Sequence, residues 1–185
     1  MPRDILVPQP ESSRKLSTPL HSLDMFCTWL AATPLSQTIQ SVEWLIPAVQ
    51  TVHILAVAMV MTSVLMIDLR LIGVGARDQT IAAVAKRFLP FIWWTLPVLL
   101  ATGATLIIAE PARALENPVF YLKMGLLLAA VTITLACQIP LARNASFWEL
   151  SAGRKRAARL IASISLPLWV AIIFAGRWIA YIQRT

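Results

Sequence analysis

Four long apolar runs set the strongest limit on how this chain can fold. Each run is about 22 to 24 residues long, and a helix of roughly 20 residues already crosses the hydrocarbon core of a bilayer. We therefore predict an all-α fold, a transmembrane four-helix bundle, with spans over 44–67, 88–109, 119–141 and 160–182.

The composition favours a membrane protein over a soluble one. Hydrophobic residues make up 58% of the chain and charged residues only 14%, whereas soluble domains carry about 25% charged residues. The net charge of +7 can also indicate a nucleic-acid binder, but here the basic residues lie at the ends of the apolar runs. At these positions they meet lipid headgroups. The predicted partner is therefore the lipid bilayer and not nucleic acid.

The segment before the first run is more polar than the rest of the chain. Residues 1–23 carry charges and prolines and lack the early apolar core of a signal peptide, so we expect a flexible tail. Residues 24–40 mix apolar and polar positions, which predicts a short interfacial helix, broken near Pro34, with Trp29 at the headgroup level. Residues 24–185 then form a single membrane domain.

Basic residues are distributed unevenly among the three connections between the spans. The first and third connections are rich in arginine and lysine, whereas the second has Arg113, with Lys123 just beyond it. The positive-inside rule places the first and third connections in the cytoplasm. We therefore expect a multi-pass protein of the bacterial inner membrane with both termini outside the cytoplasm.

His53 is the strongly ionisable residue inside the first run. It follows Trp44 by nine residues and so lies about 13 Å below the outer boundary of the membrane. Three interpretations stay open: axial ligation of a haem iron, a structural histidine bonded to a carbonyl, Glu110 or Gln138, and handling of protons or metal. The chain has two histidines and His21 lies in the tail, so one bundle cannot hold a bis-histidine haem.

Other charged residues are placed near the ends of the runs. Lys123 opens the third span and Arg177 lies near the outer end of the fourth. Each either pairs with an anionic ligand group, such as a haem propionate, or extends to the lipid headgroups. Asp68 and Arg70 follow the first run, and we interpret them as an ion pair that marks the membrane boundary.

Several stretches resemble a known protein family. With His53, the stretches DLRLIGVG at 68–75, TGATLIIAEPAR at 102–113 and ENPVFYLKMGLLLAA at 116–130 resemble an uncharacterised family of small bacterial four-helix integral membrane proteins. The resemblance covers 44–181. It implies the four-helix membrane fold and no established activity, because this family is a domain of unknown function.

A weaker likeness connects the chain to HemJ-type protoporphyrinogen oxidases and to the membrane domain of copper-resistance protein D. The similar pattern is a first-span histidine, a following Leu-Arg, a Thr-Gly in the next span and a Phe-x-x-Lys that opens the third. The HemJ family implies a haem-associated histidine and a functional lysine, which fall on His53 and Lys123. This chain departs from the pattern in lacking other membrane histidines, which argues against porphyrin oxidation and multi-haem electron transfer.

These observations lead to two functional hypotheses. In the first, the chain is a b-type haem or redox-associated membrane protein with a site in the outer half of the bundle. His53 then ligates the iron, and Lys123 and Arg177 bind the cofactor's anionic groups. In the second, it is a non-enzymatic accessory or transport-type module for a small molecule or metal, with a structural His53. Both are compatible with a homo-oligomer or a larger membrane complex, and whether the chain is an enzyme stays open.

Overall fold

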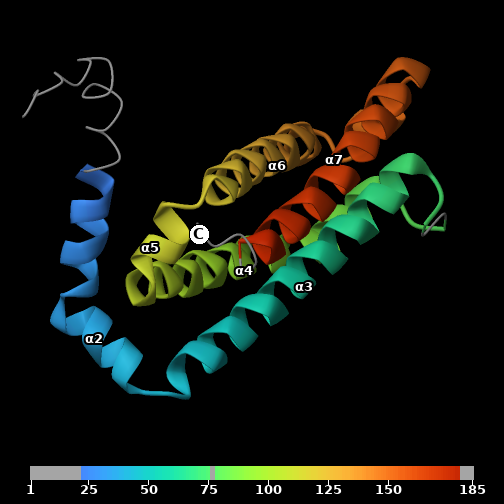
Figure 1. Cartoon of the computed structure of the whole chain (residues 1–185). Helices are drawn as coiled ribbons and strands as arrows, with labels where there is room; N and C mark the ends of the chain where they lie inside the picture. Colours follow the sequence, from blue (N-terminus) through green and yellow to red (C-terminus); the bar gives the residue numbers. More distant parts are fainter. Residues whose placement is uncertain (1–21, 76–77, 180–185) are drawn as a thin grey trace, which may run out of the picture.

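The computed structural model describes residues 22–75 and 78–179 (Figure 1). Its four long helices are α3 (Leu45–Ile72), α4 (Ile81–Ala109), α6 (Pro118–Arg143) and α7 (Ala152–Trp178). The shorter elements are α2 (Pro34–Ser41), α5 (Pro111–Leu115) and the 3₁₀ turn η1 (Phe147–Glu149), and a helix over 22–31 precedes α2. The four long helices are long and apolar enough to cross a membrane. This confirms the all-α transmembrane bundle with a short N-terminal helix.

Parts of the sequence-based prediction lie outside the described residues. These parts are the tail over 1–21, which includes His21, and the last positions of the predicted fourth span, 180–182. Residues 76 and 77 of the first connection also lie outside them.

Capping residues explain where the long helices begin and end. Thr80, Asn117 and Ser151 precede α4, α6 and α7, and each side chain accepts a hydrogen bond from a backbone N–H of the first turn. These bonds satisfy donors that the start of a helix leaves unpaired. At the other end of α3, Gly73 has a φ of 94°, a left-handed conformation that glycine adopts without strain.

Three of the helix ends lie further out than the apolar runs indicate. The helix α3 continues beyond Arg70, α4 already begins at Ile81, and α7 begins at Ala152. The basic stretch over 153–159 is therefore helical and belongs to α7 rather than to a loop. Polar residues continue a helix readily where it leaves the bilayer, so hydropathy alone does not mark the end of the helix.

Each long helix packs against particular neighbours around the core. The helix α3 packs against α4 and α7, and α7 packs against α6; Figure 1 shows α3 and α7 side by side. Between α4 and α6, Trp93 Nε1 donates a hydrogen bond to Gln138 Oε1 at 2.9 Å. The starts of α3 and α6 and the ends of α4 and α7 form what we call the His53 end of the bundle. The opposite end is the Asp68 end.

Small side chains occupy the closest contacts between the helices. Ala158, Ala162 and Ser165 recur every three or four residues on the inner face of α7, and all are buried. On α6, Ala130 is 0% exposed. Lipid tails are as apolar as leucine, so membrane helices associate mainly through close packing of such small residues and not through the hydrophobic effect. The core therefore depends on close fit between helix backbones.

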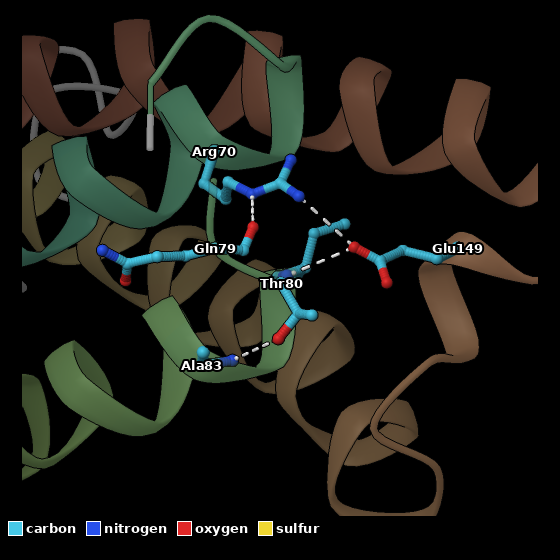
Figure 2. Close-up of polar contacts among 6 residues, drawn as sticks. Arg70, Gln79, Thr80, Ala83 and Glu149 are labelled. Carbon is cyan, nitrogen blue, oxygen red and sulfur yellow. Dashed lines mark hydrogen bonds and ion pairs between the residues drawn. The ribbon is translucent and has the colours of Figure 1, made fainter. Parts of the chain in front are cut away.

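An ion pair and hydrogen bonds join three elements at the Asp68 end (Figure 2). Glu149 Oε1 lies 3.4 Å from Arg70 Nη2 and accepts a hydrogen bond from the Ile81 backbone N–H at 3.3 Å. Arg70 Nε donates to the carbonyl of Gln79 at 2.6 Å. The predicted pairing of Asp68 with Arg70 is therefore wrong. Residues two apart point to different sides of a helix, and only the Arg70 side meets η1.

The helix α2 covers the end of α4 at the His53 end of the bundle. Ser36 Oγ donates to the carbonyl of Ile108 and Gln40 Nε2 donates to the carbonyl of Ala109, both at 2.7 Å. The last turn of a helix has no internal donors for these carbonyls.

The helix over 22–31 leaves large apolar side chains exposed, as expected for a helix at a membrane surface: Met25, Phe26 and Trp29.

Candidate functional site

His53 faces α4 near the His53 end of the bundle. Its Nδ1 atom lies 2.7 Å from Oγ1 of Thr102. The partners expected for a structural histidine are engaged elsewhere, because Glu110 pairs with Arg113 at 2.6 Å and Gln138 accepts a hydrogen bond from an indole of α4. The partner of His53 is thus a threonine hydroxyl.

The hydrogen bonds of Thr102 determine which imidazole nitrogen is free. A hydroxyl has one proton, and Thr102 Oγ1 lies 2.7 Å from the carbonyl of Val98 in the preceding turn. When the hydroxyl donates its proton to that carbonyl, His53 Nδ1–H donates to Thr102 Oγ1. This arrangement leaves the Nε2 lone pair available as a ligand. A histidine that binds a metal usually has its other nitrogen held in this way.

Lys123 brings a second nitrogen to the same end of the bundle from α6. Its side chain lies along α7 at Gly176, where a Cβ atom would stand 3.4 Å from Lys123 Nζ. The lysine is also the charged group that acts electrostatically on the His53 ring. On α4, a Cβ atom added at Gly103 would lie 3.8 Å from His53 Cε1. All four long helices therefore contribute a residue to this end of the bundle.

The charges of this site are unbalanced. Within the described residues, no carboxylate forms a salt bridge with His53 or Lys123, because Glu110 is paired with Arg113. Arg177 follows Gly176 in the last turn of α7 and its side chain is exposed. Two basic nitrogens, on His53 and Lys123, that form no salt bridge within the described residues are suited to a ligand that carries an anionic group.

Sequence reasoning missed the roles of two residues. Thr102 was part of a recognised Thr-Gly pattern, but no local signal shows that it faces His53. Asp68 was assigned to the membrane boundary, yet it is only 5% exposed. The signal for its burial was its spacing, since it extends the buried stripe on α3 that includes Val60 and Val64. An apolar residue on that stripe, Leu71, follows it by three positions.

A model for a protein family of unknown function matches residues 38–182. This match includes all four long helices. The chain belongs to the family DUF6644. The DUF6644 match confirms the resemblance to a domain of unknown function and contains His53, Thr102, Lys123 and Arg177. No curated protein and no solved structure matches the chain.

Proposed function

We propose that this chain is a redox-associated membrane protein that binds a b-type haem at the His53 end of the bundle. The observation that carries the proposal is an imidazole held through Nδ1 by Thr102, at the end of the bundle where Lys123 forms no salt bridge within the described residues. A haem needs both groups, since its iron takes a nitrogen ligand and its propionates are anions.

The ligand atoms and charges of the described residues fit a haem. His53 offers Nε2 to the iron, Thr102 holds the ring through Nδ1, and Lys123 offers an ammonium to a propionate. We propose Arg177 as a second anchor for an anionic group, because it neighbours the glycine that Lys123 contacts. Haem supplies one-electron chemistry when it is bound. The chain would orient the His53 imidazole, neutralise a haem propionate with Lys123 and surround the site with apolar helices.

We also propose that the protein acts as a homo-oligomer or within a larger membrane complex. The donor set of one chain supports this idea, because the described residues include no histidine other than His53. Met59 and Met124 are exposed, so either would join His53 as a haem ligand only if it turned inward or met another subunit.

Haem content tests the role of His53. We expect the wild-type protein, purified from haem-sufficient cells or reconstituted with haemin, to show a Soret band and a pyridine haemochrome. His53→Ala should lose the bound haem because the iron loses its nitrogen ligand. Thr102→Val should weaken haem binding by about 10- to 100-fold, since a residue that orients a metal ligand typically contributes that much. Haem per folded protein is the measurement.

Matched variants separate this result from misfolding. Thr105→Val removes a hydroxyl one turn from Thr102 that bonds only to its own helix at Ala101, so it should bind haem normally. Lys123→Ala should weaken binding by roughly tenfold or more, because it removes a charge-assisted contact; Lys123→Arg should restore part of it. Wild-type protein that stays colourless after reconstitution would refute the haem proposal. The accessory or transport-type module would then be the better hypothesis.

The distribution of basic residues supports a proposal for location and orientation. Exposed arginines and lysines gather at the Asp68 end: Lys86, Arg87, Arg154, Lys155, Arg156 and Arg159. By the positive-inside rule this end faces the cytoplasm of a bacterial inner membrane, and both termini lie outside. A periplasmic reporter fused after Thr185 should be active, and one inserted at Gly153 should be inactive. The opposite pattern would reverse the orientation.

A further inference from the structure

A second polar cluster lies in the Asp68 half of the bundle, away from the His53 site. A cavity of about 30 Å³ lies between α3, α4, α6 and α7 there and is lined by residues of all four helices. A single water molecule needs about 10–15 Å³ of such a cavity volume. Its polar lining consists of five side chains: Asp68, Thr134, Cys137, Gln138 and Ser165. The rest of the lining is apolar, including Ile92 and Leu71.

The carboxyl group of Asp68 is incompletely satisfied in this cavity. The Ser165 hydroxyl lies near the carboxyl group, but Asp68 Oδ2 is buried without a hydrogen-bond partner among the described residues. A buried charged oxygen without a partner is costly. The cavity beside Asp68 is where a compensating group would fit.

The other oxygens of the cavity offer lone pairs rather than protons. Thr134 donates its hydroxyl proton to the carbonyl of Ala130 at 2.9 Å. Gln138 Oε1 accepts one hydrogen bond from Trp93 and keeps a second lone pair. The Ser165 hydroxyl oxygen lies in the same lining, near the Asp68 carboxyl group. A group that binds all of these oxygens must carry positive charge or donate protons.

The charge balance limits the kind of group. Asp68 is the one charged residue in the lining of the cavity. The nearest arginine in sequence, Arg70, is paired with Glu149 outside the cavity. When Asp68 is ionised, its single carboxylate balances a single positive charge, and hard oxygen ligands suit alkali cations better than soft metals. The cavity volume admits an alkali cation and excludes an organic cation such as choline.

We propose that this cavity binds one monovalent alkali cation, held by Asp68 Oδ2 and by oxygens of Thr134, Gln138 and Ser165. The site is distinct from the proposed haem site, and the two share only the helices that carry them. Asp68 follows His53 by 15 residues on α3, or about 22 Å along the helix. Each site can therefore be tested without the other.

Cys137 provides a direct reporter for this cation. Its thiol lines the cavity, and the chain's other cysteine, Cys27, is buried far from it in the helix over 22–31. Burial and the nearby carboxylates of Glu116 and Asp24 raise the pKa of the Cys27 thiol, and Cys27 does not line the cavity, so its rate serves as the internal reference. The experiment compares alkylation of both cysteines in detergent by N-ethylmaleimide, in sodium, potassium or choline chloride at equal ionic strength.

We expect sodium or potassium, and not choline, to slow the alkylation of Cys137 relative to Cys27. If the occupied site does not react, a concentration of the alkali cation ten times its dissociation constant slows the reaction about elevenfold. Asp68→Asn should abolish this protection while keeping the size of the side chain. Asp78→Asn, which changes an exposed acid in the connection between α3 and α4, should retain it.

Thr134→Val keeps Asp68 and removes one proposed ligand, so it should weaken this protection even if Asp68→Asn does not fold. Equal Cys137 rates in all three salts would overturn the cation site. Protection by sodium or potassium that survives in folded Asp68→Asn would also overturn it. The haem content of the wild-type protein is unaffected by either outcome.

Discussion

Replacing Ala130 with leucine should lower the free energy of unfolding by about 1–3 kcal/mol, because added methylene groups overpack a site without free space. Ala130 is 0% exposed in a core whose other small residues include Ala158 and Ala162. In a membrane the cost is steric, since leucine gains nothing by leaving the lipid. SDS titration of the purified protein, followed by helical circular dichroism, measures the change.

The adjacent alanine supplies the control for this prediction. Ala129 is the preceding residue of the same helix, but its side chain is exposed. Ala129→Leu should therefore leave the titration midpoint almost unchanged, because it adds only lipid-facing surface. Equal destabilisation by both changes would show that α6 does not present Ala130 to the core.

Replacing Glu149 with alanine should destabilise the Asp68 end by about 1–3 kcal/mol, because it leaves a charged donor and a backbone donor without their acceptor. Glu149 contacts Arg70 and the N–H of Ile81 at once, and the Arg70 side chain is only 17% exposed. Glu149→Gln keeps an acceptor oxygen and should cost less than Glu149→Ala. Thermal unfolding of the variants in detergent measures the order.

The exposed ion pair at the other end is the comparison for Glu149. Arg113 and Glu110 are paired at 2.6 Å, but their side chains are 40% and 43% exposed, and such pairs contribute only about 0–1 kcal/mol. Arg113→Ala should therefore change stability less than Glu149→Ala. The reverse order would mean that η1 is not held to α3 and α4 by Glu149.

The sequence alone determined the helices and the most conspicuous polar group. Apolar runs of spanning length are a local property, and a helix satisfies its own backbone whatever its neighbours are. His53 was recognisable for the same reason, because an ionisable residue inside such a run is costly wherever the helix packs. Lys123 and Arg177 were recognisable because each is a charged residue near the end of an apolar run.

Only the tertiary structure decided which residues meet. The bond from His53 to Thr102 depends on the relative height and rotation of α3 and α4, and no local pattern encodes either of them. The contact between Lys123 and Gly176 likewise depends on how α6 lies against α7. Hydropathy measures composition along the chain and carries no information about which side of a helix faces a neighbour.

Asp68 and Arg70 show this limit most clearly. In the sequence both are charged residues at the end of an apolar run, and an ion pair at the boundary was the simplest interpretation. In the structure Arg70 turns to Glu149, which is distant in sequence, and Asp68 turns into the core beside Ser165. The helix separates two residues two positions apart onto different faces, and the packing of α7 and η1 against α3 decided which face became buried.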